Sequence, residues 1–127
     1  MSDIKILTFF EKERICEERF RRAGQFWHLY SDGTVMENIF LNDTEMKAGL
    51  SILAASVQMV KPEIRLVTFA LMKNHIHLIL CGHREKCLQL FDIFKDKMRR
   101  IFRKTIRGID WNRFNATILS IDSLKAL

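Results

Sequence analysis

Two apolar runs rich in β-forming residues, 66–72 and 75–80, lie near the middle of the chain. They flank a short polar pair, Lys73 and Asn74. Apolar runs on either side of such a pair predict two antiparallel strands joined by a tight hairpin loop. We expect the rest of the chain to be organised around this hairpin.

The second predicted strand carries two histidines, His75 and His77. Because strand side chains alternate between the two faces of a sheet, both histidines should share one face with Ile79. The opposite face should be wholly hydrophobic, formed by Ile76, Leu78 and Leu80. The hairpin is therefore expected to combine one core face with one face that presents two imidazoles.

Helical and strand patterns surround the hairpin. Before the hairpin they predict an amphipathic helix at 2–22, a strand at 25–30 closed by a turn at 31–33, and a helix capped by residues 42–45, whose inward residues are Met46, Leu50, Leu53, Ala54 and Val57. After the hairpin they predict a helix at 84–105, a loop at 108–115 and a strand at 117–121. The inward residues of this second helix are Leu88, Phe91, Phe94, Met98 and Ile101. The first long helix should end before Pro62, and residues 122–123 could cap one more helix. This order predicts an α+β fold, a ferredoxin-like sandwich with an antiparallel sheet, plus an N-terminal helix.

Composition is that of one globular domain of 127 residues. Its apolar runs are much shorter than the roughly 20 residues that cross a bilayer, and the charged N-terminus does not resemble a signal peptide. Cys16, Cys81 and Cys87 form no Cys-x-x-Cys motif. We therefore expect a cytoplasmic protein with reduced, structural thiols and no membrane partner.

Positive charge is concentrated in the last predicted helix. Residues 84–107 hold nine basic and three acidic residues, which accounts for the whole net charge of +6. One or two cations near a helix C-terminus would complement the helix dipole, but this segment has many more. We expect it to contact nucleic acid through Lys97, Arg99, Arg100, Arg103, Lys104 and Arg107.

A metal ion is one possible ligand of the histidine pair. Alternate strand residues lie roughly 6.5–7 Å apart at Cα, close enough for His75 and His77 to share a divalent ion. Cys81 is four residues beyond His77, on the order of 13 Å along a strand, which makes it too distant to join them. A His-x-His pattern alone also fits ordinary surface or half-buried histidines.

The sequence around the pair resembles a known family. Met72, Asn74, His75, Ile76 and His77 match the signature of the IS200-like single-tyrosine transposases, including the REP-associated tyrosine transposases, in which a Met-x-Asn turn leads into a histidine-hydrophobe-histidine strand. Residues 26–33 resemble that family's first strand and turn, and the basic helix after Gly82 resembles its DNA-contacting helix. The resemblance covers most of the chain, residues 25–121.

That resemblance implies a single-stranded DNA nuclease and strand transferase of the HUH type. It implies that His75 and His77 hold Mg²⁺ or Mn²⁺ against the scissile phosphate, and that Asn74 forms the turn before them. The implied partner is single-stranded DNA, at hairpin ends. A homodimer in the bacterial cytoplasm, associated with the nucleoid, is implied as well.

The family's nucleophilic tyrosine lies on a helix after the last strand, which also supplies a further metal ligand. Tyr30 is the single tyrosine of this chain and lies in the first predicted strand, so we expect it to pack or to stack on a base. We therefore expect an N-terminal helical extension at 1–24 and, at 25–127, a transposase domain that lacks its C-terminal helix. It should bind DNA and metal without covalent cleavage. Three explanations for the missing helix remain open: a gene remnant, a shortened chain, or a protein that has kept DNA binding after losing transposition.

Two other classes of protein remain open. A non-catalytic module could bind single-stranded nucleic acid through backbone charge and through stacking on aromatic residues such as Phe26, Trp27 and Trp111. A small metal-binding or interaction protein, whose basic helix meets an acidic partner, is the other. Nucleic-acid binding that does not depend on a metal ion would favour the non-catalytic module over a transposase-type site. Salt-sensitive binding to DNA hairpins would argue against a protein that meets an acidic partner.

Overall fold

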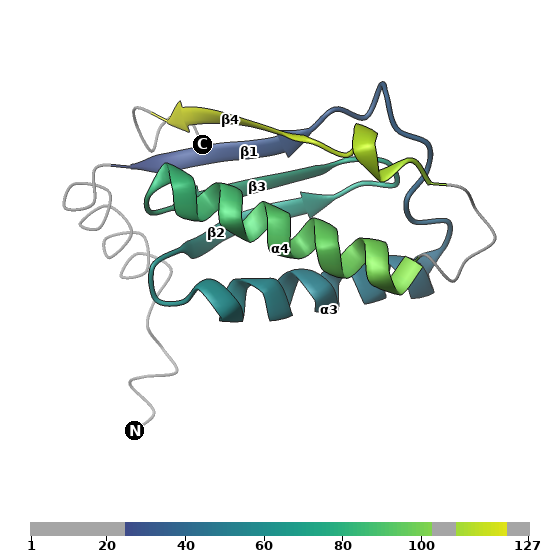
Figure 1. Ribbon diagram of the computed structural model, residues 1–127, viewed down its shortest axis with the longest axis horizontal. Coiled ribbons are helices and arrows are strands. Elements are labelled where there is room, and N and C mark those ends of the chain that lie inside the picture. The colour runs from purple at the N-terminus through teal and green to yellow at the C-terminus, as the bar shows by residue number, and fades with distance from the viewer. Residues whose placement is uncertain (1–24, 103–108, 122–127) are drawn as a thin grey trace, which may run out of the picture.

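Strands and helices form two layers in the computed structural model, which describes residues 25–102 and 109–121. The elements, in chain order, are β1 (Phe26–Ser31), α3 (Asp43–Val60), β2 (Arg65–Leu71), β3 (Ile76–Cys81), α4 (Arg84–Phe102), a short 3₁₀ helix (Trp111–Arg113) and β4 (Ala116–Ile121) (Figure 1). The strands form one antiparallel sheet in the order β2-β3-β1-β4. This βαββαβ arrangement is ferredoxin-like, which confirms the predicted fold class.

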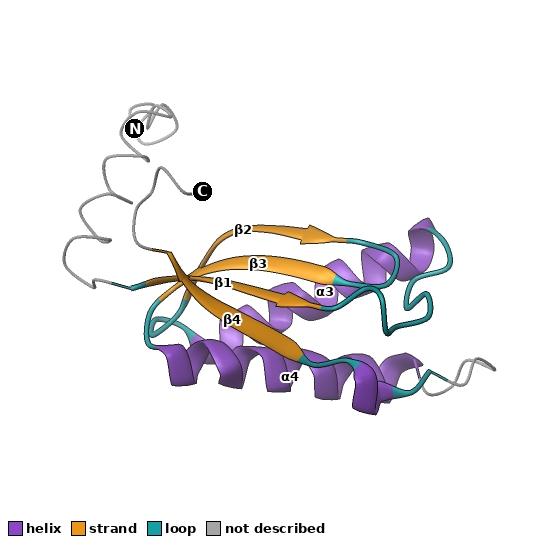
Figure 2. Ribbon diagram, turned by 90° about the horizontal axis from the view of Figure 1, so that it is seen from above, coloured by secondary structure: helices purple, strands orange, loops and turns teal. Residues whose placement is uncertain are grey.

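Both helices cover the same face of the sheet, as Figure 2 shows. Ile76, Leu78 and Leu80 of β3 are fully buried on that face, as the alternation of the strand predicted. Leu29, the partner of Leu78 on β1, is also fully buried. The hydrophobic core therefore lies between the sheet and the two helices, and we call the opposite side of the sheet the far face.

Helix α3 begins and ends where its signals predicted. The Asn42 side chain accepts a hydrogen bond from the Glu45 backbone N–H at 2.9 Å, and the Glu45 carboxylate accepts one from the Leu41 N–H at 2.8 Å. The first bond satisfies an amide group that the first helical turn leaves without a helical partner, and the second holds the residue before the cap against that turn. The helix stops at Val60, two residues before the proline.

The predicted inner face of α3 was partly wrong. Leu50 is 44% exposed, and Ala54 is also exposed. The buried residues are instead Gly49, Ile52, Leu53, Ser56, Val57 and Val60. A Cβ atom at Gly49 would lie 2.4 Å from the Phe40 ring, so the glycine allows that ring to reach the helix backbone and turns this side of the helix inward.

Helix α4 is amphipathic, as predicted, but its buried stripe is shifted. Leu88 is half-buried and Ile101 is 52% exposed, whereas the residues inside are Cys87, Leu90, Phe91, Phe94, Met98 and Phe102. The register is set by the phenylalanines that meet Phe114 and Phe40 across the core. The predicted continuation of the helix, at 103–105, lies outside the described residues.

The hairpin between β2 and β3 is closed by a backbone hydrogen bond from the Met72 N–H to the His75 carbonyl, at 2.8 Å. This bond leaves Lys73 and Asn74 at the tip, as predicted. The Lys73 carbonyl accepts hydrogen bonds from the Ile39 and Phe40 N–H groups at 2.7 and 3.0 Å. The hairpin tip is therefore fixed against the segment that connects β1 with α3.

Some predictions fall on residues outside the described parts of the chain. These are the N-terminal helical extension at 1–24, the thiol of Cys16 and the cap at 122–123. Within residues 25–102 and 109–121, no helix has the length and hydrophobicity needed to span a membrane.

Candidate functional site

Three histidines meet on the far face, near the hairpin. His77 is in β3, His28 is in the neighbouring strand β1, and His75 lies in the hairpin just before β3. The ring of His77 lies 5.1 Å from that of His75 and 5.2 Å from that of His28, measured between ring centroids. The predicted pair is therefore brought together, and we call these three residues the histidine cluster.

The orientation of His75 is set by the turn residues around it. Its Nδ1 lies 2.8 Å from Oδ1 of Asn74, whose amide nitrogen donates a hydrogen bond to the Gly33 carbonyl at 2.8 Å. Because a carboxamide oxygen only accepts, Nδ1 carries the proton and Nε2 is the nitrogen left for a ligand. Asn74, predicted as the turn before the histidine strand, thus connects His75 to the turn that follows β1.

His77 is held in a comparable way by His28 of the neighbouring strand β1. Its Nδ1 lies 3.0 Å from Nε2 of His28, with which it shares a hydrogen bond. Burial, followed by the charges of His28 and His75, lowers the pKa of His77 below its ordinary value of 6.5. The neutral ring is the form that binds metal ions, so the lowered pKa keeps this form available to more acidic pH.

Tyr30 also belongs to this region of the sheet. It is the direct cross-strand partner of His77, and their ring centroids are 6.0 Å apart with an interplanar angle of 22°. The ring of His28 is 4.8 Å from that of Tyr30. Tyr30 and His28 share a face because side chains alternate along β1, and the register of the sheet places that face beside the histidine face of β3.

The strand register arranges these rings in two rows across the far face. One row reads Ala70, His77, Tyr30 and Thr117, and the next reads Thr68, Ile79, His28 and Leu119. The outer residues of both rows are exposed, while the rings of the central strands are half-buried. Short side chains, Ala70 and Thr117, therefore flank the central pair of rings.

The donor set for a metal ion consists of the two imidazoles. Among the described residues, no group of three or more His, Cys, Asp or Glu side chains is placed to hold a metal. Asp32 lies in the adjoining turn, where its Oδ1 accepts hydrogen bonds from the Thr34 N–H and hydroxyl at 2.8 and 2.7 Å. These two bonds, the side-chain bond first, lower the pKa of Asp32. An ion at His75 and His77 would thus need water or phosphate oxygens to complete its shell.

Of the three aromatic residues that the sequence suggested for base stacking, Phe26 is too buried for that role, whereas Trp27 and Trp111 are half-buried. Phe26 is 1% exposed and offers no free ring face. Trp27 is half-buried, packs against the core and donates from Nε1 to the Gly82 carbonyl at 2.9 Å. Trp111 is half-buried against Phe114, at 5.9 Å between ring centroids.

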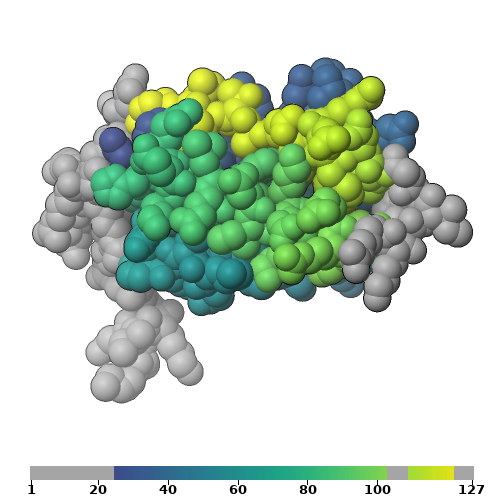
Figure 3. Space-filling view, viewed as in Figure 1, coloured from purple at the N-terminus to yellow at the C-terminus, as the bar shows by residue number. Residues whose placement is uncertain are grey.

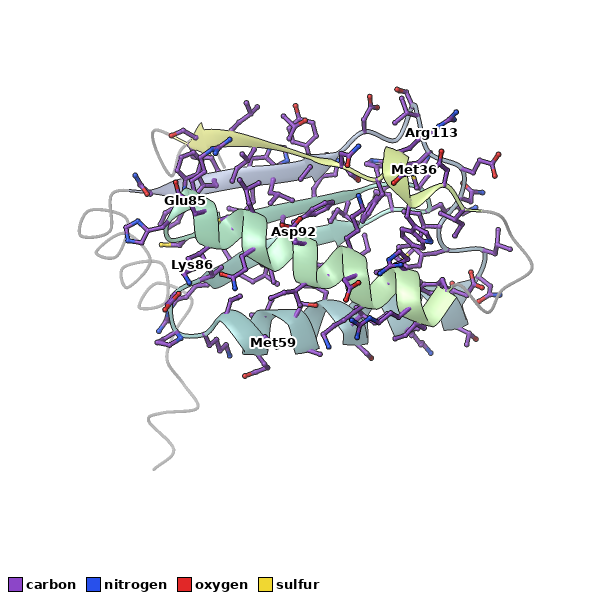
Figure 4. All side chains as sticks on the ribbon, in the orientation of Figure 1. Met36, Met59, Glu85, Lys86, Asp92 and Arg113 are labelled. Carbon is purple, nitrogen blue, oxygen red and sulfur yellow. The ribbon has the colours of Figure 1, made fainter. Side chains whose placement is uncertain are left out.

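The basic residues of α4 lie on the other side of the molecule from the histidine cluster. Lys97 and Arg100 line a shallow groove of about 480 Å³ between α3 and α4, on the helical surface seen in Figure 3. Asp96 bridges Arg99 at 2.8 Å and Arg100 at 3.0 Å, and the hydrogen bond from Arg99 is the main cause of its lowered pKa. Glu85 and Asp92 lie nearer the start of α4 (Figure 4), so positive charge increases toward its C-terminal end.

Three of the predicted DNA-binding residues, Arg103, Lys104 and Arg107, lie outside the described residues. The described basic end of α4 and the hairpin lie at the same end of the molecule, as Figures 1 and 2 agree. The histidine cluster nevertheless lies on the far face, whereas α4 covers the opposite face of the sheet. A bound strand would have to pass around this end of the molecule to contact both.

Cys81 and Cys87 are buried free thiols, and neither belongs to the histidine cluster. Burial, followed by the nearby Cys81 and Glu85, raises the pKa of Cys87 to about 12. A thiol with this pKa is almost entirely protonated at neutral pH and is a poor nucleophile or metal ligand. Cys87 therefore fits the structural role expected of it.

Comparison with solved structures found eight matching chains, among them a transposase-like protein. A protein described as a "putative transposase" from Deinococcus radiodurans R1 superposes with a TM-score of 0.57 at 18% sequence identity, over 80% of this chain and 81% of that chain. At this identity the similarity shows a shared fold. Comparisons with protein-family models and with curated proteins found no match.

Proposed function

We propose that this chain is a DNA-binding protein of the transposase type, in which His75 and His77 hold a divalent ion, Mg²⁺ or Mn²⁺, against a phosphate of single-stranded DNA. The observation that carries the proposal is the meeting of the two imidazoles at the hairpin, at 5.1 Å between ring centroids. The shared fold with the Deinococcus radiodurans protein supports it.

The two histidines fit such an ion in one further respect. Each Nδ1 already has a hydrogen-bond partner, Asn74 Oδ1 for His75 and His28 Nε2 for His77. Metal-binding histidines commonly donate a hydrogen bond from the second ring nitrogen to a neighbouring group, which fixes the ring for the ion. When bound, the ion would neutralise phosphate charge and orient the phosphate at the site.

The proposed activity stops at binding. Tyr30 is the single tyrosine, and its phenol ring packs beside His28 and His77 in the middle of the sheet. A strand transferase needs a nucleophile that can approach the phosphorus in line, and a side chain rooted in the sheet beside the metal ligands has little freedom to do so. We therefore propose retention of hairpin DNA without a phosphotyrosyl intermediate.

The test is binding of purified protein to single-stranded DNA hairpins, in Mn²⁺ and in chelator, followed by denaturing gels. Wild type should bind more tightly in Mn²⁺, and His75→Ala/His77→Ala should lose this increment. His83→Ala is the matched control, because His83 is exposed and lies before α4. Equal affinity in Mn²⁺ and in chelator would refute the metal site. A covalent adduct that wild type forms with DNA and Tyr30→Phe does not would show that Tyr30 cleaves DNA and would refute binding without cleavage.

A non-catalytic single-strand-binding module is the second candidate. The observation in its favour is the donor count, because the described residues offer no third protein ligand beside the two imidazoles. In that case the histidines contact nucleic acid directly. Binding would then be indifferent to chelator and would fall steeply with salt.

A further inference from the structure

We infer that Tyr30, with His28 and His77 beside it, forms a base-stacking platform for single-stranded DNA on the far face. This inference rests on the proposed function, since it assigns the place where a nucleotide base lies next to the phosphate at His75 and His77. Tyr30 is not a metal ligand in that proposal. Its contribution can therefore be measured separately from that of the ion.

The platform is built by the two central strands of the sheet. Tyr30 and His77 are cross-strand partners, and the planes of their rings differ by 22°. The ring of His28 is inclined by 22° to that of His77 and by 36° to that of Tyr30. The three ring centroids thus lie within 6.0 Å of one another, with the ring of His77 close to parallel to the other two and the rings of His28 and Tyr30 tilted against each other.

The neighbours of these rings leave room for a flat ligand. Ala70 follows His77 in the row across the sheet and Thr117 follows Tyr30, and both are exposed. Side chains this short do not rise around the rings. None of the residues in this row or the next is acidic, so nothing in them repels a polyanionic strand.

The chemistry of such a surface suits a nucleobase. Four-stranded sheets in other single-strand-binding domains stack about two or three bases on exposed aromatic side chains. Every base has a π-face, so stacking tolerates any sequence, while the backbone is attracted by the positive charge of the protein, here +6. Bases in a duplex are already stacked on one another, so the platform selects single strands.

The experiment compares Tyr30→Ala, Tyr30→Phe and wild type in binding to a single-stranded oligodeoxynucleotide that carries one 2-aminopurine, in Mn²⁺ and in chelator. Tyr30→Ala should raise Kd by roughly 5- to 150-fold and weaken 2-aminopurine quenching, because it removes the ring. Tyr30→Phe keeps the ring and should bind as wild type. Circular dichroism establishes that each variant is folded, and Tyr30→Leu replaces the alanine variant if that one unfolds.

Phe69→Ala provides a matched aromatic control. Phe69 is 43% exposed, but it pairs with Leu78 and so lies on the side of the sheet away from the platform. Its removal should leave Kd unchanged. The difference between Tyr30→Ala and Tyr30→Phe should also vanish on duplex DNA of the same sequence.

The outcomes separate this inference from the metal site. A loss in Tyr30→Ala that is the same in Mn²⁺ and in chelator supports the platform, whether or not His75→Ala removes a metal-dependent increment. Wild-type affinity in Tyr30→Ala would overturn it. An equal loss in Tyr30→Phe would overturn it too, because the hydroxyl rather than the ring would then be responsible.

Discussion

Gly33→Ala is expected to destabilise the native protein by about 1 kcal/mol, because a methyl group at this position meets the His75 ring. The added Cβ would lie 2.8 Å from Nδ1 of His75 and 3.1 Å from Oδ1 of Asn74. Ordinary contacts between carbon atoms are about 3.5–4.0 Å, so the ring must move by roughly half an ångström or more.

The magnitude follows from three terms. Forcing the ring off its rotamer costs about 0.5–1.5 kcal/mol. Weakening its hydrogen bond to Asn74, now 2.8 Å long, costs up to a similar amount. Alanine offsets about 0.4–1 kcal/mol of this, since it restricts the unfolded chain more than glycine does, and the φ of Gly33 is not in the positive range that alanine avoids.

The assay is urea unfolding of Gly33→Ala in two backgrounds, wild type and His75→Ala. Without the imidazole the closest contact disappears and only the one with Asn74 Oδ1, at 3.1 Å, remains, so Gly33→Ala should become close to neutral or slightly stabilising. The double-mutant cycle should therefore give a coupling of about 1–2 kcal/mol between the two positions. An equal destabilisation in both backgrounds would refute the contact between Gly33 and His75.

Three further predictions concern pH, a thiol and a helix cap. Burial is the main cause of the lowered folded-state pKa of His77, so the free energy of unfolding should fall as the pH drops from 6.5 toward that lowered value. In His77→Gln the free energy of unfolding should depend less on pH over this range. Urea unfolding that gives the same pH dependence for wild type and His77→Gln would contradict this. Cys87, fully buried with a pKa of about 12, should resist iodoacetamide in the native protein and react in urea; alkylation of the native protein, seen by peptide mass spectrometry, would contradict it. Asn42→Ala should lower the free energy of unfolding, measured in urea, by about 1 kcal/mol, and Asn42→Asp by much less. The reason is that the Asn42 side chain only accepts a hydrogen bond at the cap, which a carboxylate oxygen can do as well. Equal losses in the two variants would point to another cause.

Local signals predicted the fold well. The hairpin tip at Lys73 and Asn74, the start of α3 at its Asn42 cap and its end before Pro62 each depend on neighbouring residues. Alternation in β3 also predicted which side chains are buried. These features need no knowledge of distant parts of the chain.

Long-range packing decided what the sequence could not. The inner face of α3 depends on Phe40 reaching Gly49, and a helical pattern cannot show that contact. His28 and His77 are 49 positions apart, so their hydrogen bond follows from the pairing register of β1 and β3. The same register brings Tyr30 into the histidine cluster.

The path of a bound strand was also beyond sequence reasoning. A concentration of basic residues predicted a polyanion-binding helix, but not the side of the sheet on which that helix lies. The structure separates Lys97 and Arg100 from the histidine cluster by the thickness of the sheet. A strand that contacts both would therefore bend around the end of the molecule that contains the hairpin.

The most direct test of the proposed site is an NMR titration with Mn²⁺ in the presence of a single-stranded DNA hairpin, observed through the histidine ring resonances. Paramagnetic broadening should reach His75 and His77 first, at Mn²⁺ concentrations that leave the exposed His83 sharp. That result would support an ion held between the two histidines and phosphate. Broadening of His83 at the same or a lower concentration, or no preference among the rings, would contradict the account.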